Sequence, residues 1–313
     1  MTKSLSLYQK AVLELMFAGF IWGLSFIFVT WALKDFTTYS LIFWRFVIAL
    51  VVGEALLFIF NRPSFKESHS DIRLSFWSGL GLGMALMTQT SGLNYTTATN
   101  SSFITSLYVV LIPIASAFVF RKTVKFKVKI DHFFLALLAF LGMALLLNIP
   151  DQLQNGKLSF NKGDLITVLT AITSTMHILC VSLAAPKIKN GFRFNTYQTF
   201  WALLLLIPFL IYENITQSVQ VWPNSPSLSS ILSVVALALL VSMVAFYLQV
   251  RAQKILSATT ASMLCLLEAP FAFLFALFLL NESLNFIQSI GAIIILLSSA
   301  LSVFIERPKN REA

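Results

Sequence analysis

The stretch AVLELMFAGFIWGLSFIFVTWAL, residues 11–33, carries one charged side chain, Glu14, in about 23 positions. A helix of that length rises about 34 Å, which is enough to cross the ~30 Å hydrocarbon core of a bilayer. Nine similar apolar segments follow it, at residues 38–60, 72–94, 97–120, 133–149, 164–185, 194–212, 228–250, 259–280 and 286–305. The pattern predicts an all-α membrane protein with ten transmembrane helices.

The composition supports a chain that is solvated mainly by lipid. Hydrophobic residues make up 58% of the sequence and charged residues only 11%, and a soluble surface needs far more charge than this. Only helices and closed barrels satisfy the backbone in lipid, and these segments are continuously apolar instead of alternating as barrel strands do. We therefore expect helices.

The basic residues are distributed asymmetrically over the predicted connections. Eighteen of the 22 Lys and Arg residues fall at the termini and in the connections on the same side of the membrane. The opposite side holds Lys34, Lys157 and Lys162, and Arg45 lies inside a segment. The positive-inside rule then places both termini in the cytoplasm. Because the charge is spread over many short loops, a nucleic-acid partner is not expected.

Motifs for catalysis or cofactor binding are absent from the sequence. It has no GxxxxGK[ST], HExxH or GxSxG pattern, and Cys180 and Cys265 lie far apart inside apolar segments. An intramembrane enzyme needs a nucleophile paired with a base, or a metal set, and only His177 and Glu268 approach such an arrangement. We expect no catalytic residues, no metal, no cofactor and no enzyme activity.

An internal repeat connects the two halves of the chain. Residues 95–109, YTTATNSSFITSLYV, align with residues 255–269, ILSATTASMLCLLEA, at an offset of 160, with identities at 98, 99, 102 and 107. Since each half holds five segments, an odd number, the second half is inverted relative to the first. We expect two five-helix repeats, residues 1–150 and 163–306, and a cytoplasmic tail, residues 307–313. Inverted repeats are common in secondary transporters, with the substrate site near the bilayer midplane.

The chain also resembles a known family, the EamA-like members of the drug/metabolite transporter superfamily. The resemblance rests on Trp22-Gly23 followed by Phe26, on Arg45, on residues 92–113 (GLNYTTATNSSFITSLYVVLIP), and on Gly163-Asp164, His177-Ile178, Leu267-Glu268 and Asn281-Glu282. It implies ten helices in two repeats, with the first, third, fourth, sixth, eighth and ninth around a central cavity. It also implies movement of small metabolites such as amino acids across a bacterial inner membrane, mainly outward.

Depth within the segments selects candidate cavity residues. Trp22, Tyr108, His177 and Glu268 each lie about nine to thirteen residues from the start of a segment, close to the midplane. A carboxylate at that depth costs on the order of 3 kcal/mol unless it faces a cavity, finds a partner or takes up a proton. Glu268 is therefore expected to bind a substrate amino group or carry a proton, or else to hydrogen-bond a neighbouring helix in its protonated form.

The other candidates have structural alternatives as well. His177 can titrate near neutral pH, or can tie two helices together. Tyr108 and Trp22 can stack on a substrate or contact an ammonium group, or can pack in the core. Arg45, about seven residues into its segment, can hold a substrate carboxylate or bond helix ends, and Gln89 and Tyr247 can contact substrate or bond between helices. All seven are predicted to line a transport cavity.

These observations predict a secondary active transporter of small polar metabolites, amino acids or related compounds, that exports them by alternating access. Protons are the candidate coupling ion. Two alternatives remain: an uptake or exchange carrier for a nucleotide-like metabolite such as S-adenosylmethionine, and a membrane scaffold that transports nothing. The sequence does not indicate the oligomeric state.

Overall fold

The structure is a computed structural model that describes residues 5–60, 64–93, 95–96, 98–119, 130–156, 161–217, 220–280 and 285–307. Within these ranges every regular element is a helix. The Asn281-Glu282 motif, Lys157, and the basic residues of 121–129 lie outside the described residues. So does most of the expected tail, since the description ends at Arg307.

Eight candidate membrane spans are present among the described residues, and a shorter apolar helix accompanies them. The spans are α1 (Leu7–Ala32), α2 (Thr38–Phe60), Asn100–Val119, Lys162–Lys187, Gly191–Thr216, Leu228–Gln253, Ala258–Phe275 and α14 (Phe286–Glu306), and the shorter helix is α6 (Ile130–Leu146). The third expected segment lies within α3 (Phe65–Leu93), whose Ser, Thr and Gln residues give it a lower mean hydropathy. The prediction of a helical, multi-pass membrane protein is confirmed.

Two of the expected segments are each formed by a pair of shorter helices. Residues 97–120 contain α4 (Ala98–Thr105) and α5 (Tyr108–Val119), while residues 259–280 contain α12 (Ala258–Cys265) and α13 (Glu268–Leu280). At each break, hydrogen bonds between residues three apart replace the α-helical bonds between residues four apart. The amide of Leu107 donates to the carbonyl of Ile104 at 3.1 Å, and the amide of Leu267 donates to the carbonyl of Leu264 at 3.2 Å. The two breaks are again 160 residues apart.

The remaining elements complete the second half. They are α7 (Ile149–Gln154), α8 (Lys162–Ala184), the 3₁₀ turn η2 (Ala185–Lys187), α9 (Gly191–Gln217), and a long helix made of α10 (Leu228–Ala236), η3 (Leu237–Ala245) and α11 (Phe246–Gln253). The middle part of that long helix, η3, is π-helical. Such segments free backbone carbonyls from the α-helical pattern and occur often at functional positions.

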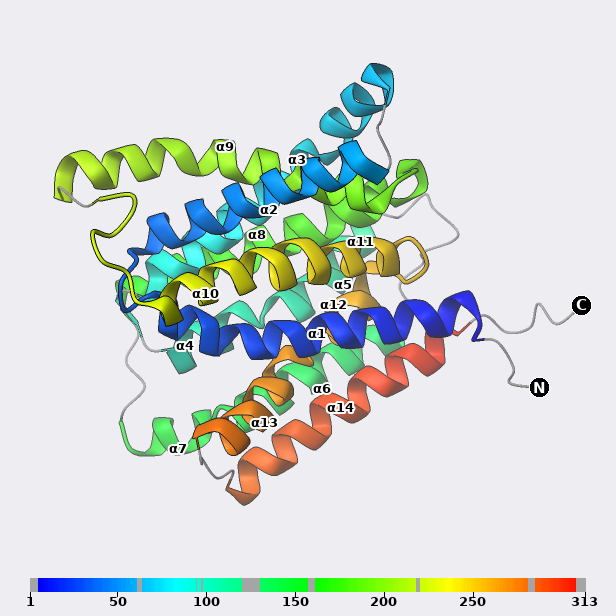
Figure 1. The fold of residues 1–313 in the computed structure, drawn as a ribbon. Coiled ribbons are helices and arrows are strands. Elements are labelled where there is room, and N and C mark those ends of the chain that lie inside the picture. The colour runs from blue at the N-terminus through cyan, green and yellow to red at the C-terminus, as the bar shows by residue number, and fades with distance from the viewer. Residues whose placement is uncertain are drawn as a thin grey trace, which may run out of the picture.

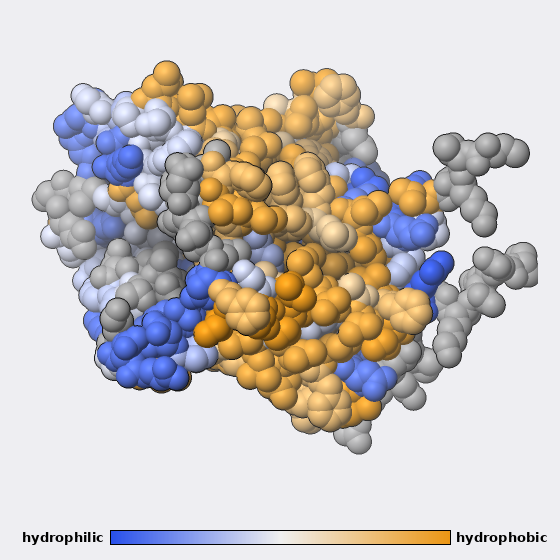
Figure 2. Space-filling model, turned by 90° about the horizontal axis from the view of Figure 1, so that it is seen from below, coloured by the Kyte–Doolittle hydropathy of each residue, from blue (hydrophilic) through white to orange (hydrophobic). Residues whose placement is uncertain are grey.

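The helices run roughly along one direction, and the beginning of α1 and the end of α14 lie at the same end of the bundle (Figure 1). A hydrogen bond joins them, from the Tyr8 hydroxyl to the carbonyl of Val303 at 2.6 Å. Seen from below, apolar side chains form a broad belt, and hydrophilic residues gather toward the two ends of the bundle (Figure 2). Such a belt is the surface expected of a protein embedded in lipid.

The two helices that close the halves of the sequence, α6 and α14, pack directly on each other. They meet at Gly142 and Gly291, where a Cβ added to Gly291 would lie 2.3 Å from the backbone nitrogen of Leu146. Only a residue without a side chain allows this approach, as small residues commonly do between membrane helices. Elsewhere in the bundle, α3 packs along α8, while α1 packs along α10, η3 and α11.

Candidate functional site

A cavity of about 390 Å³ lies between α1, α3, α4, α5, α6 and the break between α12 and α13. Apolar side chains such as Phe26, Ile27 and Phe273 form much of its wall. Its polar lining consists of Thr30, Gln89, Ser102, Thr105, Ser106, Tyr108 and Glu268. A mostly apolar hollow with a few convergent polar groups is the usual form of a small-molecule site, for which volumes run from ~300 to 1,000 Å³.

Glu268 and Tyr108 occupy equivalent places in this cavity. Glu268 is the first residue of α13 and Tyr108 the first of α5, so each follows one of the two helix breaks. Tyr108 is 6% exposed, and the Glu268 side chain is partly exposed toward the cavity. No described side chain forms a hydrogen bond or ion pair with the Glu268 carboxylate. It lies at the N-terminal end of α13, where the helix dipole favours negative charge.

Hydroxyl groups of α4 and α1 add hydrogen-bonding capacity that the sequence analysis missed. Thr105 and Ser106, at the end of α4 and the start of the break, follow Ser102 by three and four residues, so both lie about one turn beyond it. The Thr105 Oγ1 atom is buried and has no hydrogen-bond partner in the described structure. Buried polar groups nearly always have a partner, so an unpartnered hydroxyl beside the cavity is unusual. The signal was visible as the hydroxyl-rich run within residues 99–106.

The cavity extends toward the end of the bundle opposite the chain termini. Thr30 and Trp31, in the last turn of α1, line it, and Trp31 is 42% exposed. Toward the other end an aromatic layer closes the bundle: the Phe246 ring lies 5.5 Å from that of Trp22 and 5.8 Å from that of His177, between centroids. The cavity therefore lies toward the end of the bundle opposite the termini, and Trp22 of the aromatic layer precedes its first lining residue, Gly23, along α1.

The structure brings three of the seven predicted site residues, Gln89, Tyr108 and Glu268, into the cavity. Trp22 belongs to the aromatic layer, next to Gly23 of the cavity wall. His177 also lies in that layer, only 4% exposed, and its Nε2 is 3.3 Å from Oε1 of Gln198.

Arg45 lies outside the cavity, buried against the π-helical segment. Its Nε donates to Oγ of Ser242 at 2.7 Å. The Asn195 side chain of α9 donates to the carbonyls of Ser242 and Met243, at 2.9 and 3.2 Å, and Gln198 donates to Asn195 at 2.7 Å. A chain of polar contacts thus links Arg45 to His177 through η3. The sequence analysis missed Asn195 and Gln198, although they stood out as amides inside an apolar segment.

Tyr247 lies in a different cleft, at the end of the bundle that holds the termini. The guanidinium of Arg251 lies 5.5 Å from its ring centroid, and Arg251 Nη1 donates to the Tyr247 hydroxyl at 3.4 Å. The ring of Phe192 packs edge-on against it at 5.6 Å. This tyrosine is therefore remote from Glu268 and Tyr108 in the described structure.

Comparison with known proteins places these features in a family. A sequence model of the EamA-like transporter family matches residues 9–148 and again residues 161–304. The chain belongs to the EamA-like transporter family. An uncharacterized transporter of Archaeoglobus fulgidus is 31% identical over 288 residues, which cover 92% of this chain and 84% of that protein. A second one from the same organism is 25% identical over 292 residues, covering 91% and 94%.

Similarity to solved structures supports the same fold. A crystal structure of a protein that shares 17% identity superposes with a TM-score of 0.74, covering 95% of this chain and 97% of the other. Membership of the EamA-like family makes the chain a multi-pass membrane transporter, and these matches point to transport instead of enzyme catalysis. A small-molecule substrate and a surrounding bilayer fit this assignment.

Proposed function

We propose that this EamA-like protein is a secondary active transporter that exports small polar metabolites of the amino acid class by alternating access. It would lie in a bacterial inner membrane with both termini in the cytoplasm, as the distribution of basic residues indicates. Its ten helices would form two inverted repeats, residues 1–150 and 163–306. The double match to the family model and the two helix breaks 160 residues apart support this arrangement.

The observation that carries the proposal is the Glu268 carboxylate in the cavity, which forms no hydrogen bond or ion pair with any described side chain. An amino acid presents an ammonium group, which a carboxylate with no other partner would bind, and the face of the Tyr108 ring would add a cation–π contact. Gln89 and Ser102, which also line the cavity, would bond the other polar groups of the ligand. A volume of about 390 Å³ suits a small metabolite.

Alternating access requires that the open end close and the closed end open around this cavity. With cytoplasmic termini and a cavity toward the opposite end, this structure would correspond to an outward-open state. Inward opening would then separate the aromatic layer around Phe246 and the ion pair between Arg251 and Glu14, whose atoms lie 2.7 Å apart. Protonation of Glu268 would release the ammonium group, which is how a proton gradient would be coupled to export.

The test uses purified protein in proteoliposomes. A thermal-shift screen of amino acids, with S-adenosylmethionine included, identifies a ligand, because a bound substrate stabilises the folded state by mass action. Flux of that ligand is then compared between wild type, Glu268→Gln and Glu54→Gln. Glu54 is a matched control, since it is a membrane-segment carboxylate outside the cavity.

Glu268→Gln is expected to lower flux at least about tenfold, because it removes one charge-assisted hydrogen bond to the substrate. Glu54→Gln is expected to retain wild-type flux. Equal flux and equal pH dependence in the three proteins would remove Glu268 from the mechanism. Absence of flux for every stabilising ligand would favour the scaffold alternative.

A further inference from the structure

A second cleft, of about 400 Å³, lies at the end of the bundle that holds the termini. It is formed by the beginning of α3, the connection between η2 and α9, and the end of α11. Its lining is almost entirely polar or charged and consists of Glu67, Lys189, Asn190, Gly191, Arg193, Tyr247, Arg251 and Lys254. This composition contrasts with the apolar walls of the transport cavity and indicates a different ligand.

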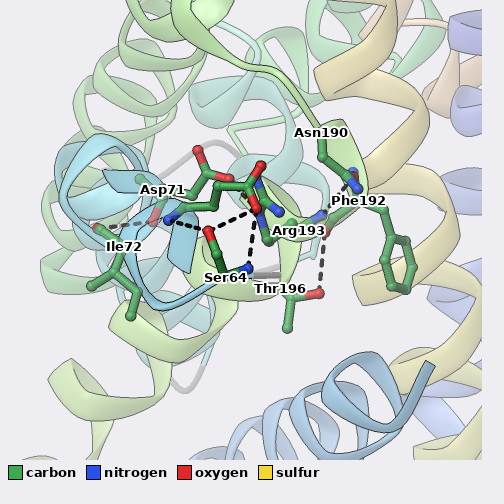
Figure 3. A network of polar contacts seen from close by, with 9 residues as sticks. Ser64, Asp71, Ile72, Asn190, Phe192, Arg193 and Thr196 are labelled. Atoms are coloured by element: carbon green, nitrogen blue, oxygen red, sulfur yellow. Dashed lines mark hydrogen bonds and ion pairs between the residues drawn. The ribbon is translucent and has the colours of Figure 1, made fainter. Parts of the chain in front are cut away.

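Two of the four cations in the cleft, Arg193 and Arg251, already form ion pairs with carboxylates. Arg193 is 3% exposed, and its Nε donates to the buried Asp71 carboxylate, while its Nη2 lies 3.9 Å from Glu67. Figure 3 shows Arg193 between the beginning of α3, with Ser64 and Asp71, and the Asn190 cap of α9. This buried pair fixes the two helices that form one wall of the cleft.

Arg251 is also paired, with Glu14 of α1 at 2.7 Å, but it is 47% exposed. Its position is fixed by the Tyr247 ring on which it stacks. Its remaining donors can therefore reach the cleft without a large loss of side-chain freedom.

Lys189 and Lys254 form no ion pair with any described carboxylate. Both ammonium groups line the same hollow, where the Glu67 carboxylate also interacts electrostatically with Lys189 and compensates these charges only in part. An anion between the two lysines relieves their remaining repulsion. The N-terminus of the 27-residue helix α9 borders the cleft at Gly191, and its dipole adds further positive potential. The site thus combines two ammonium groups that form no ion pair, the half-exposed guanidinium of Arg251 and a helix end.

We propose that this cleft binds a phosphate-bearing anion. A phosphate group carries the charge that two ammonium groups compensate, and its oxygens accept from Lys, Arg and backbone donors at once. The phosphate could belong to a headgroup of the lipid leaflet on that side or to a soluble phosphate ester, and both present the same chemistry. The bound anion would link α11 to the connection before α9, and would stabilise the closed state of this end.

The experiment measures thermal stabilisation of the purified full-length protein in neutral detergent. The probes are phosphatidylglycerol, the zwitterionic phosphatidylcholine as a reference, and soluble glycerol phosphate. The variant Lys189→Gln/Lys254→Gln removes both lysine charges. Lys187→Gln is the matched control, because Lys187 is an exposed lysine at the end of η2, two residues before Lys189, and does not line the cleft.

We expect an anion to stabilise the wild type and the control equally, and to bind at least about tenfold more weakly to the double variant. Raising the salt concentration from 0.1 to 0.5 M should weaken the effect. Stabilisation by phosphatidylglycerol alone assigns the site to a lipid headgroup, and equal stabilisation by glycerol phosphate assigns it to a soluble ester. No anion-dependent stabilisation, or the same stabilisation of the wild type and the folded double variant, would overturn the proposal.

Discussion

The contact between α1 and α13 at Gly23 allows a quantitative prediction. A Cβ at this position would lie 2.7 Å from Cβ of Phe271, 2.8 Å from the backbone nitrogen of Ala272 and 2.9 Å from the carbonyl oxygen of Glu268. Two of these three atoms belong to the backbone and cannot move without shifting α13. Gly23→Ala should therefore force the two helices apart.

The magnitude follows from two opposing effects. Overpacking of this kind costs about 1–3 kcal/mol, and backbone contacts place Gly23→Ala near the upper limit. The gain in helix propensity from Gly to Ala offsets up to about 1 kcal/mol, which leaves a net loss of about 2 kcal/mol. At Gly19, one turn earlier on α1, the nearest atom lies at 3.4 Å, an ordinary contact. Gly19→Ala should therefore be neutral or slightly stabilising.

The assay compares thermal unfolding of the two variants in the same detergent. At roughly 2–4 °C per kcal/mol, a difference of about 2–3 kcal/mol separates their midpoints by about 4–12 °C. Flux should fall as well in Gly23→Ala, because the shift moves the backbone of Glu268 and the cavity wall. A midpoint for Gly23→Ala equal to or above that of Gly19→Ala would refute the reasoning.

Three further predictions concern the ends of the bundle and its closed layer. Asp71→Asn leaves the buried Arg193 without its main partner and should lower the free energy of unfolding by about 3 kcal/mol; unchanged thermal stability would contradict this. Hydrogen bonds from Ser227 lower the pKa of Asp35 to about 2, so the stabilisation they provide is present above about pH 4 and is lost as the pH falls toward 2. Melting curves of Asp35→Asn should accordingly depend less on pH in that range than those of the wild type. Phe246→Ala opens the aromatic layer and should make substrate-loaded vesicles leak, whereas vesicles as tight as those with wild-type protein would exclude a closing role.

Much of the fold was predictable because lipid imposes simple rules. The expected segment 38–60 coincides with α2, and residues 286–305 differ from α14 by a single residue. The helix breaks at residues 106–107 and 266–267 were not predicted, since both lie in continuously apolar or hydroxyl-rich sequence. Pro270 contributes to the second break, because it has no amide hydrogen to donate to the carbonyl of Leu266. The amide of Ala269 donates to that carbonyl instead.

The candidate site was predictable only in part. Depth along a helix follows from counting residues, and it selected Glu268 and Tyr108, which the structure places in the same cavity. The direction in which a side chain points depends on helix rotation, which depth does not determine. Arg45 therefore faces Ser242 of η3, and His177 bonds Gln198, although both lie deep in the membrane segments.

By itself the sequence determined that lipid surrounds most of this protein and where its apolar segments lie, because both follow from composition and from counting residues against a fixed bilayer thickness. It also predicted the 160-residue repeat and a position for Glu268 near the middle of its segment. Only the tertiary structure decided toward which end of the bundle the cavity lies, which polar groups share it and which charges form ion pairs among the described residues. Those properties depend on contacts between helices far apart in the chain, such as Trp22 with Phe246 and Arg193 with Asp71. Such contacts are set by packing, and no local pattern encodes them.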